Sequence, residues 1–316
     1  MACPRRPDRS SLQEPKIIAI RKSAKTRNDR SKRRNPLIFL LLALAYLSGC
    51  APANIPATPA FRSTSSPTPQ PTATLTPAGC TATQGQVLHL QIPSTLLPGP
   101  LAFNLYLPPC YSDHPDRPYP VLYLLHGQGF EDDQWVRLGA TRTADQLIFS
   151  GQSRSFLIVM PEEENSTLAD PNISHFGDAL TGELVPWIDA HYPTCSQRSC
   201  RAIGGLSRGA AWAVRLGLTH PDLFGAIGAH SLPLFVGDLY RASTWLDDIP
   251  AGQMPQFYLD IGRSDRYLSQ AESFEQLLSD RHIAHTWQLN DGDHDEVYWN
   301  AHTPEYIQWY ASNWGK

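Results

Sequence analysis

Short, uninterrupted apolar runs recur along the chain after residue 79 and alternate with amphipathic segments. The run Val-Leu-Tyr-Leu-Leu is typical of them, because it has the length of a buried strand and ends in a glycine-containing turn. Such runs predict strands at 121–125, 156–160, 201–206, 226–230, 256–261 and 285–289, and the segments between them predict helices near 142–150, 178–191, 208–219, 268–280 and 303–313. This alternation predicts an α/β fold with a mainly parallel sheet and helices on both of its faces.

Two segments ahead of this series alternate between apolar and polar positions. Residues 87–92 and 101–107 predict the strands of an antiparallel hairpin, joined through a Pro- and Gly-containing connection at 93–100. Cys80 and Cys110 are equidistant from the middle of this connection, so pairing of the two strands would bring them opposite each other. The sequence therefore predicts a Cys80–Cys110 disulfide beside an N-terminal hairpin.

The first 49 residues have the composition of an export signal. Of the 26 Lys and Arg in the chain, 12 lie within residues 1–36, and an uncharged apolar run of 11 residues follows at 37–47. That run is about half as long as a helix that spans a bilayer, so the pattern is typical of a secretory signal peptide. It leads into Leu-Ser-Gly and Cys50, which resembles a bacterial lipobox and predicts lipidation of Cys50. An ordinary signal peptide that contains a cysteine, and a single-pass anchor, are the alternatives.

Residues 50–78 consist mainly of Pro, Thr, Ser and Ala and carry a single charge, Arg62. Such a stretch buries too little apolar surface to offset the loss of chain entropy, which predicts an extended, disordered spacer. Residues 79–316 remain for one domain and are long enough for a large hydrophobic core. We therefore expect an exported domain that a lipid anchor holds to the bacterial cell membrane or cell surface.

The composition of the chain after the leader limits the classes of partner that it can bind. It carries 14 Lys and Arg against 27 Asp and Glu, and this acidity argues against nucleic acid as a partner and against direct binding to an anionic bilayer. Cys195 and Cys200 are predicted to form a disulfide, in agreement with export, with two free thiols or a metal pair as alternatives. The acidic runs at 131–133 and 162–164 raise the hypothesis of a calcium site, but a solvated face explains them better, and no metal or cofactor is predicted.

The predicted strand at 201–206 runs into Gly-Leu-Ser-Arg-Gly at 205–209 and then into a predicted helix. In a strand-turn-helix elbow the serine adopts a strained backbone conformation that lifts its hydroxyl clear of the sheet, and the flanking glycines avoid collisions with neighbouring backbone. Ser207 is therefore the candidate nucleophile. Its hydroxyl would lie at the N-terminus of the helix, where unpaired N–H groups favour the negative charge that develops in acyl transfer.

An acid and a histidine follow later in the chain, in the order that this architecture requires. His294 lies in a polar loop after the predicted strand at 285–289 and is the candidate general base. Asp265 lies in the turn after the strand at 256–261 and is the candidate acid that would orient the imidazole. Asp260 is the rival acid, but a carboxylate inside a strand would point into the core or the neighbouring layer, away from the loops where active sites form.

An oxyanion hole is the remaining part. The first strand of the parallel series ends in His-Gly-Gln-Gly-Phe, where glycine lets backbone N–H groups turn towards a bound carbonyl oxygen. The predicted donors are the backbone N–H groups of Arg208 and Gln128, with Gly127 or Gly129 as alternatives to Gln128. His126 is interpreted as a hydrogen-bonded support for the loop, since a second catalytic base would have no task.

With these parts in order, the chain resembles the putative-esterase family of α/β-hydrolases, which includes S-formylglutathione hydrolase, bacterial mycolyltransferases and feruloyl or acetyl-xylan esterases. The motifs that carry the resemblance lie at 105–111, 119–127, 205–209 and 292–295, with Trp299 after them. The resemblance covers roughly residues 83 to 315 and implies an α/β-hydrolase fold. It also carries the family's nucleophile, acid and base over to Ser207, Asp265 and His294.

The chain departs from many of these relatives in two motifs. It has Arg-Gly-Ala after the serine where they have Met-Gly-Gly, and Gly-Asp-His where they have Gly-Gly-His. Arg208 would place a cation beside the acyl site, so substrate preference does not carry over from any one relative.

Together these features predict an exported serine esterase that acts through an acyl-enzyme intermediate on small-molecule or glycan-linked acyl esters. Acyl transfer to a cell-envelope acceptor is the nearest enzymatic alternative. A catalytically silent module that binds a glycan or a partner is an alternative of another class. The connection at 231–255 is predicted to form a wall or lid of the substrate pocket.

Overall fold

The computed structural model describes residues 80–111, 118–164, 166 and 170–315. The predicted signal peptide, the lipidation site Cys50 and the spacer at 50–78 lie outside these residues and stay predictions. No helix in the described part of the chain is long and apolar enough to cross a membrane.

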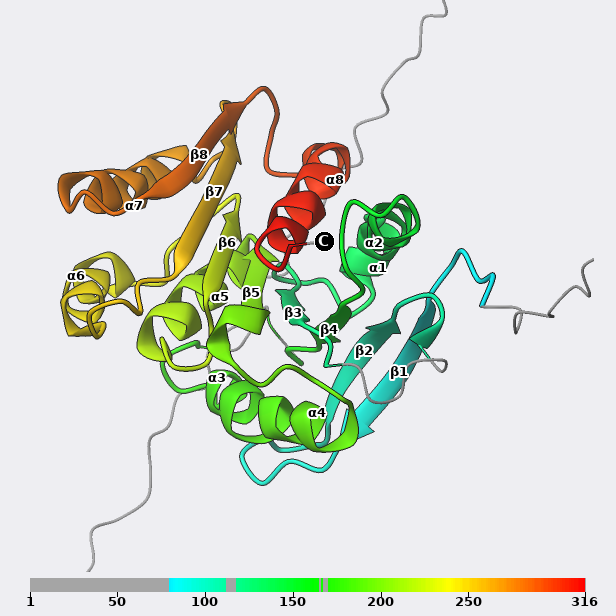
Figure 1. The fold of residues 1–316 in the computed structure, drawn as a ribbon. Helices are drawn as coiled ribbons and strands as arrows, with labels where there is room; N and C mark the ends of the chain where they lie inside the picture. The colour runs from blue at the N-terminus through cyan, green and yellow to red at the C-terminus, as the bar shows by residue number, and fades with distance from the viewer. Residues whose placement is uncertain (1–79, 112–117, 165, 167–169, 316) are drawn as a thin grey trace, which may run out of the picture. The chain divides into compact units, whose positions relative to one another are not determined.

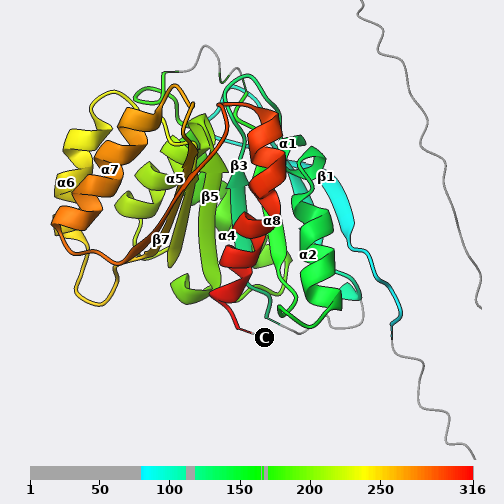
Figure 2. The same cartoon turned by 90° about the horizontal axis from the view of Figure 1, so that it is seen from above.

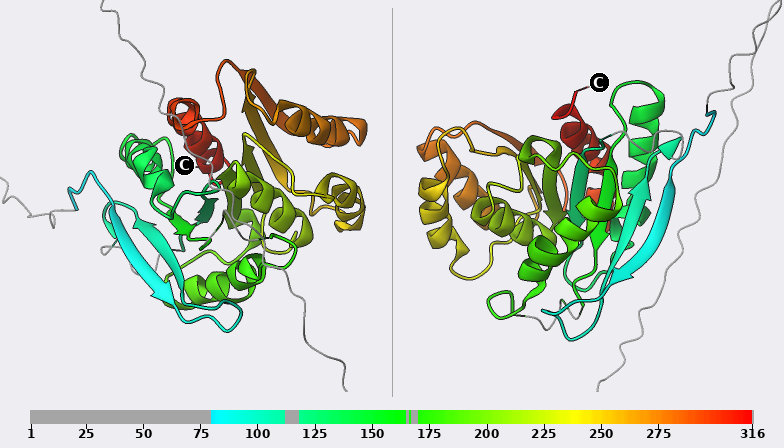
Figure 3. Two further views of the ribbon diagram at one scale, coloured as in Figure 1. Left: turned by 180° about the vertical axis from the view of Figure 1, so that it is seen from behind. Right: turned by 60° about the horizontal axis from the view of Figure 1, so that its bottom comes forward.

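The strands of the described residues form one sheet (Figure 1), and they are β1 (Gln86–Ile92), β2 (Leu101–Leu107), β3 (Val121–Leu125), β4 (Leu157–Pro161), β5 (Arg201–Leu206), β6 (Ala226–His230), β7 (Gln256–Gly262) and β8 (His285–Asn290). Their order in the sheet is β1-β2-β4-β3-β5-β6-β7-β8. β2 pairs antiparallel with both β1 and β4, whereas every other pair is parallel. The predicted α/β fold, a mainly parallel sheet led by an antiparallel hairpin, is confirmed, with the hairpin at one edge (Figure 3).

Helices cover both faces of the sheet (Figure 2), and they are α1 (Gln134–Arg137), α2 (Ala140–Phe149), α3 (Phe176–Ala179), α4 (Val185–His191), α5 (Arg208–Thr219), α6 (Asp238–Asp248), α7 (Leu268–Asp280) and α8 (Glu296–Ser312). One apolar cluster joins the sheet to α1, α2 and α8. The other cluster joins it to α3, α4, α5, α6 and α7. Each face of the sheet is therefore covered by its own layer of helices.

Four helical segments differ from the predictions, and the first is the short helix α1, which was not predicted. The single helix predicted at 178–191 is divided into α3, a π-helical turn at Leu180–Leu184, and α4. The helix predicted near 303–313 is only the end of α8, which begins much earlier because the side chain of Asp295 accepts a hydrogen bond from the first turn. The connection predicted at 231–255 contains α6, a helix that is hard to recognise because few of its residues are buried.

Both predicted disulfides are present in the structure. The Cα atoms of Cys80 and Cys110 lie 5.6 Å apart, and this bond ties the residues ahead of β1 to those that follow β2. The Cα atoms of Cys195 and Cys200 lie 5.7 Å apart, just before β5, so these cysteines are neither free thiols nor metal ligands.

The apolar runs in the sequence correspond to the central strands of the sheet. Every residue of β3, β4, β5 and β6 is buried, as expected for parallel strands that are covered on both faces. The carboxyl ends of parallel strands meet at one edge, so the loops after β3, β5, β7 and β8 come together there. These loops carry the predicted site residues.

Candidate active site

Ser207 lies in the turn between β5 and α5. Its backbone has φ 53° and ψ −124°, a conformation that residues with a side chain rarely adopt, and its N–H donates to the carbonyl of His230 (2.9 Å). A Cβ on Gly205 would collide with the backbone of Gly209, and a Cβ on Gly209 would collide with the carbonyl of Leu125. The strained elbow that the motif predicts is present, and close backbone contacts require both glycines.

Ser207, His294 and Asp265 form a continuous chain of hydrogen bonds. His294 Nε2 lies 2.8 Å from Ser207 Oγ, and His294 Nδ1 lies 2.8 Å from Asp265 Oδ2. The imidazole is 6% exposed and the carboxylate is 0% exposed. An imidazole in this position can take the serine proton while the carboxylate stabilises the imidazolium that forms.

The surroundings of Asp265 favour its ionised form. Burial raises the pKa of Asp265, but hydrogen bonds from His294, from the Tyr267 N–H (2.8 Å) and from Ser231 outweigh burial and leave the pKa below its ordinary value. Ser231 Oγ in turn accepts a hydrogen bond from Trp299 Nε1 (2.9 Å). Sequence reasoning missed Ser231, because no local motif marks a serine that follows β6 and meets Asp265 only through the fold.

Asp260, the rival acid, belongs to a separate buried network. One of its oxygens lies 2.6 Å from His230 Nδ1, and the other accepts hydrogen bonds from the hydroxyls of Tyr298 (2.8 Å) and Tyr306 (2.5 Å). Burial, reinforced by the charge of Asp260, raises the pKa of both tyrosines, so their hydroxyls stay protonated and donate. Asp260 therefore does not contact His294, and Asp265 is the carboxylate that does.

The loop after β3 determines which of its N–H groups can face a substrate. The Gly127 N–H donates to Gln134 Oε1 (2.8 Å), and the Gly129 N–H donates to Ser166 Oγ (2.9 Å). Within the described residues the Gln128 N–H has no hydrogen-bond partner, and Gln128 lines the same cavity as Ser207. The structure thus argues against Gly127 and Gly129 as donors and favours Gln128.

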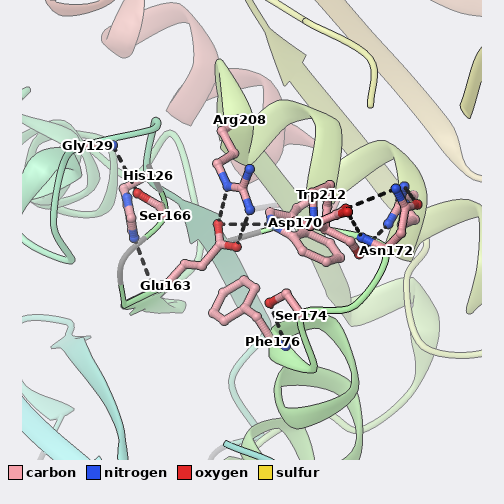
Figure 4. Close-up of polar contacts among 12 residues, drawn as sticks. His126, Gly129, Glu163, Ser166, Asp170, Asn172, Ser174, Phe176, Arg208 and Trp212 are labelled. Atoms are coloured by element: carbon pink, nitrogen blue, oxygen red, sulfur yellow. Dashed lines mark hydrogen bonds and ion pairs between the residues drawn. The ribbon is translucent and has the colours of Figure 1, made fainter. Parts of the chain in front are cut away.

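The guanidinium of Arg208 is neutralised by a buried carboxylate (Figure 4). Two of its nitrogens donate to the two oxygens of Glu163, each at 2.6 Å, and Trp212 Nε1 donates to the same carboxylate at 3.0 Å. Arg208 also lies 5.4 Å from the ring centroid of Phe235. The expected cation beside the acyl site is present, and the Glu163 carboxylate compensates its charge.

The two acidic runs come together in the fold. The Asp132 N–H donates to Glu162 Oε2 (2.6 Å), and the side chains of Asp132 and Glu163 are buried. Burial raises the pKa of Glu162 to about 7, and the charges of Asp132, Glu131 and Glu164 add to this rise. The interpretation as a solvated face is therefore wrong for Asp132 and Glu163. Among the described residues, no group of three or more His, Cys, Asp or Glu could hold a metal ion.

Two cavities lie beside these residues. A cavity of about 550 Å³ is lined by Ser207, Arg208 and the segment at 233–236, so part of the connection at 231–255 forms a wall, as predicted. A second cavity of about 580 Å³ is lined by residues 96–101 of the hairpin connection and by Glu163. Asp170 lines both cavities, and the paired side chains of Arg208 and Glu163 lie between them.

Comparison with known sequences identifies several esterases as relatives. The chain is 32% identical over 134 residues to an endo-1,4-beta-xylanase/feruloyl esterase of Xylanibacter ruminicola, a match that covers 40% of this chain and 18% of that protein. It is 24% identical over 224 residues to an acetyl esterase of Caldicellulosiruptor saccharolyticus, which covers 60% of this chain and 82% of the relative. The chain thus spans less than a fifth of the first of these relatives and most of the second.

Solved structures show the same fold. A ferulic acid esterase superposes with a TM-score of 0.64 at 23% identity, covering 73% of this chain and 99% of that one. An S-formylglutathione hydrolase from Staphylococcus aureus superposes with a TM-score of 0.62 at 20% identity, covering 75% and 100%. These likenesses show an α/β-hydrolase fold. The family model described as putative esterase matches residues 94–309, and the chain belongs to this family.

Proposed function

We propose that this protein is a serine esterase that hydrolyses carboxylic esters through an acyl-enzyme intermediate. The observation that carries the proposal is the hydrogen-bond chain from Ser207 through His294 to Asp265, with 2.8 Å at each step, at the wall of a cavity of about 550 Å³. Membership of the putative esterase family supports the same class of reaction.

Each step of the reaction uses a group in this site. His294 takes the proton of Ser207 as Oγ attacks the ester carbonyl, and Asp265 stabilises the resulting imidazolium. The backbone N–H groups of Gln128 and Arg208 hold the oxyanion of the tetrahedral intermediate. Collapse of this intermediate breaks the ester C–O bond, the alcohol leaves with the proton from His294, and the acyl group stays on Ser207. Water activated by His294 then releases the acid and restores the serine.

Acyl esters of carbohydrates outside the cell are the substrate class that we propose. The names of the xylanase/feruloyl esterase and acetyl esterase relatives support it, as do the predicted export signal and the predicted lipid anchor at Cys50. The walls of the cavity combine the aromatic side chains of Phe235 and Tyr267 with the amides of Asn172 and Gln270. Such a lining offers apolar surface to an acyl group and hydrogen bonds to a sugar.

The test compares the full chain with its Ser207→Ala variant on nitrophenyl acetate and on feruloyl and acetyl sugar esters. We expect the variant to lose roughly a thousandfold or more of kcat, because the nucleophile is removed. Ser269→Ala, an exposed serine at the start of α7, is the matched control and should keep full activity. A fluorophosphonate should label the wild type and the control but not Ser207→Ala. If the folded wild type neither turns over nor becomes labelled, the proposal is wrong.

A further inference from the structure

Glu163 is the second residue after β4, and it contacts His126 of the loop after β3 and Arg208 at the start of α5 (Figure 4). Its main-chain N–H contacts His126, which lies in the loop after β3. Its side chain contacts Arg208, which follows the nucleophile. One residue thus connects two loops that are far apart in the sequence.

The contact with His126 determines which ring nitrogen carries the proton. His126 is buried, and burial lowers its pKa, so the ring is neutral. The Glu163 N–H donates to Nε2 (2.9 Å), so Nε2 is the acceptor and the proton lies on Nδ1. Nδ1 is 2.8 Å from the carbonyl oxygen of Gly127 and must donate to it.

This hydrogen bond orients the Gln128 N–H, the proposed oxyanion donor. The Gly127 carbonyl and the Gln128 N–H belong to one planar trans peptide, so they point in opposite directions. The Gly127 oxygen is held by His126 Nδ1 and by the Phe130 N–H (3.1 Å), and the Gln128 N–H is thereby fixed on the other side. Gln128 lines the cavity that contains Ser207.

The contact with Arg208 holds the second donor. Arg208 is the first residue of α5, and its N–H follows the strained peptide of Ser207. The bidentate bonds to Glu163 fix the far end of the Arg208 side chain, and Trp212 from the next turn of α5 shares the same carboxylate. The Glu163 carboxylate therefore ties the start of α5 to the end of β4.

We propose that Glu163 is a positioning residue that aligns both N–H donors of the oxyanion hole, the Gln128 N–H through the tautomer of His126 and the Arg208 N–H through the ion pair. This inference rests on the proposed esterase function and adds to it the residue that keeps the two donors in register. If the ion pair only stabilised the fold, its loss would lower the activity on every substrate by the same factor. If Glu163 positions the two donors, its loss should lower the activity on an oxygen ester more than on a thionoester, because the oxyanion accepts the stronger hydrogen bonds.

Glu163→Gln tests the contact between the Glu163 side chain and Arg208. Glu164→Gln is the matched control, because Glu164 is exposed and it is Glu163 that pairs with Arg208. Each variant hydrolyses an ester and the corresponding thionoester, whose sulfur is the weaker hydrogen-bond acceptor. We expect kcat of Glu163→Gln on the ester to fall about 10- to 100-fold with KM nearly unchanged, which is less than the loss on removing a donor outright. The loss on the thionoester should be several-fold smaller. Equal losses on both substrates, or no loss of kcat, would overturn the inference.

Variants of His126 test the contact with the loop after β3 and leave the ion pair of Arg208 and Glu163 in place. His126→Phe removes the donor to the Gly127 carbonyl and should lower the ratio of ester to thionoester activity, whereas His126→Asn, whose amide N–H can replace Nδ1–H, should recover part of it. Equal ratios in both variants and the wild type would contradict the positioning role.

A measurement on the inactive Ser207→Ala variant separates this inference from the esterase proposal. Nitrogen NMR of the His126 ring should show the proton on Nδ1, whether or not the protein turns over any ester. A proton on Nε2 would overturn the inference and leave the esterase proposal intact. Absence of wild-type turnover, with the Nδ1 proton present, would overturn the esterase proposal instead.

Discussion

The carboxylate of Asp265 is buried and yet surrounded by donors, and this combination fixes its charge. The sequence predicts where Asp265 lies, because the turn after a buried strand is a local pattern. It does not predict the donors, since Ser231 and the Tyr267 N–H reach the carboxylate only in the folded chain. The same holds for Glu163, whose burial depends on Arg208, 45 positions away in the sequence.

Asp265→Asn should be far less active, and its effect on stability should depend on pH. The folded-state pKa of Asp265 lies below that of the unfolded chain, so its stabilising contribution is complete above about pH 4 and disappears as pH falls through the lowered folded value. The difference in free energy of unfolding between wild type and variant, measured in urea, should therefore be larger at about pH 7 than at about pH 3. We expect kcat to fall roughly 10⁴-fold, because an amide favours the wrong tautomer of His294. Asp291→Asn, at an exposed carboxylate, is the matched control. A pH-independent difference for Asp265→Asn would contradict this account.

The contribution of Glu162 to stability depends on pH in the opposite sense to that of Asp265. Its folded-state pKa of about 7 lies above the ordinary value of 4.5, so the neutral carboxyl stabilises the fold at low pH, and this contribution is lost as pH rises through about 7. Glu162→Gln cannot ionise and keeps an oxygen for the Asp132 N–H. The variant should melt at a higher temperature than the wild type above about pH 8 and at a similar one near pH 4. The same substitution at Glu272, an exposed residue of α7, is the control. Stabilisation of equal size at both pH values would argue against ionisation as the cause.

At the scale of elements, the central strands of the sheet were predictable because they are nearly continuous apolar runs. Buried parallel strands need apolar residues at every position, so β3, β5 and β6 are recognisable one by one. The elements that the sequence did not reveal are those whose burial is partial. α6 buries only three of its residues, and α8 begins with a turn that follows the site loop directly.

The elbow between β5 and α5 is the element with the least room for change. Gly209→Ala would place a methyl group against the carbonyls of Leu125 and His126, so we expect unfolding free energy to fall by about 1–3 kcal/mol and activity to be lost. Gly182→Ala is the control, since a Cβ there meets nothing within 4 Å and alanine favours a helical backbone. Chemical denaturation and ester hydrolysis measure the two effects. A stable, active Gly209→Ala protein would show that the elbow can shift more than the close contacts indicate.

At the scale of the whole molecule, the described domain is one sheet with a helical layer on each face, and the sequence ahead of it contains the predicted export signal. The order of the candidate nucleophile, acid and base along the chain was enough to predict which loops meet. Side-chain partners across those loops were not predictable, because the distances between loops depend on the sheet order β3-β5-β6-β7-β8. The choice of Gln128 over its glycine neighbours is one example.

The predicted lipid anchor is testable in the full chain. In a bacterium that processes lipoproteins, the wild type should fractionate with membranes, incorporate labelled fatty acid and extract into detergent. Cys50→Ser should lose the label and move to the soluble or secreted fraction with its activity on soluble esters unchanged, whereas Cys3→Ser should behave as the wild type. A Cys50→Ser protein that stays in membranes would instead indicate a single-pass anchor.

The Cys80–Cys110 disulfide has a mechanical consequence. Among the described strands β1 pairs only with β2, and a tension applied to the chain ahead of Cys80 would pull such an edge strand from its neighbour one hydrogen bond at a time. The covalent bond transfers that load from Cys80 to Cys110, beyond the end of β2, so the hairpin bears no force. If the predicted lipid anchor at Cys50 holds the domain, a pull on that anchor would bypass the hairpin and leave β1 and β2 paired.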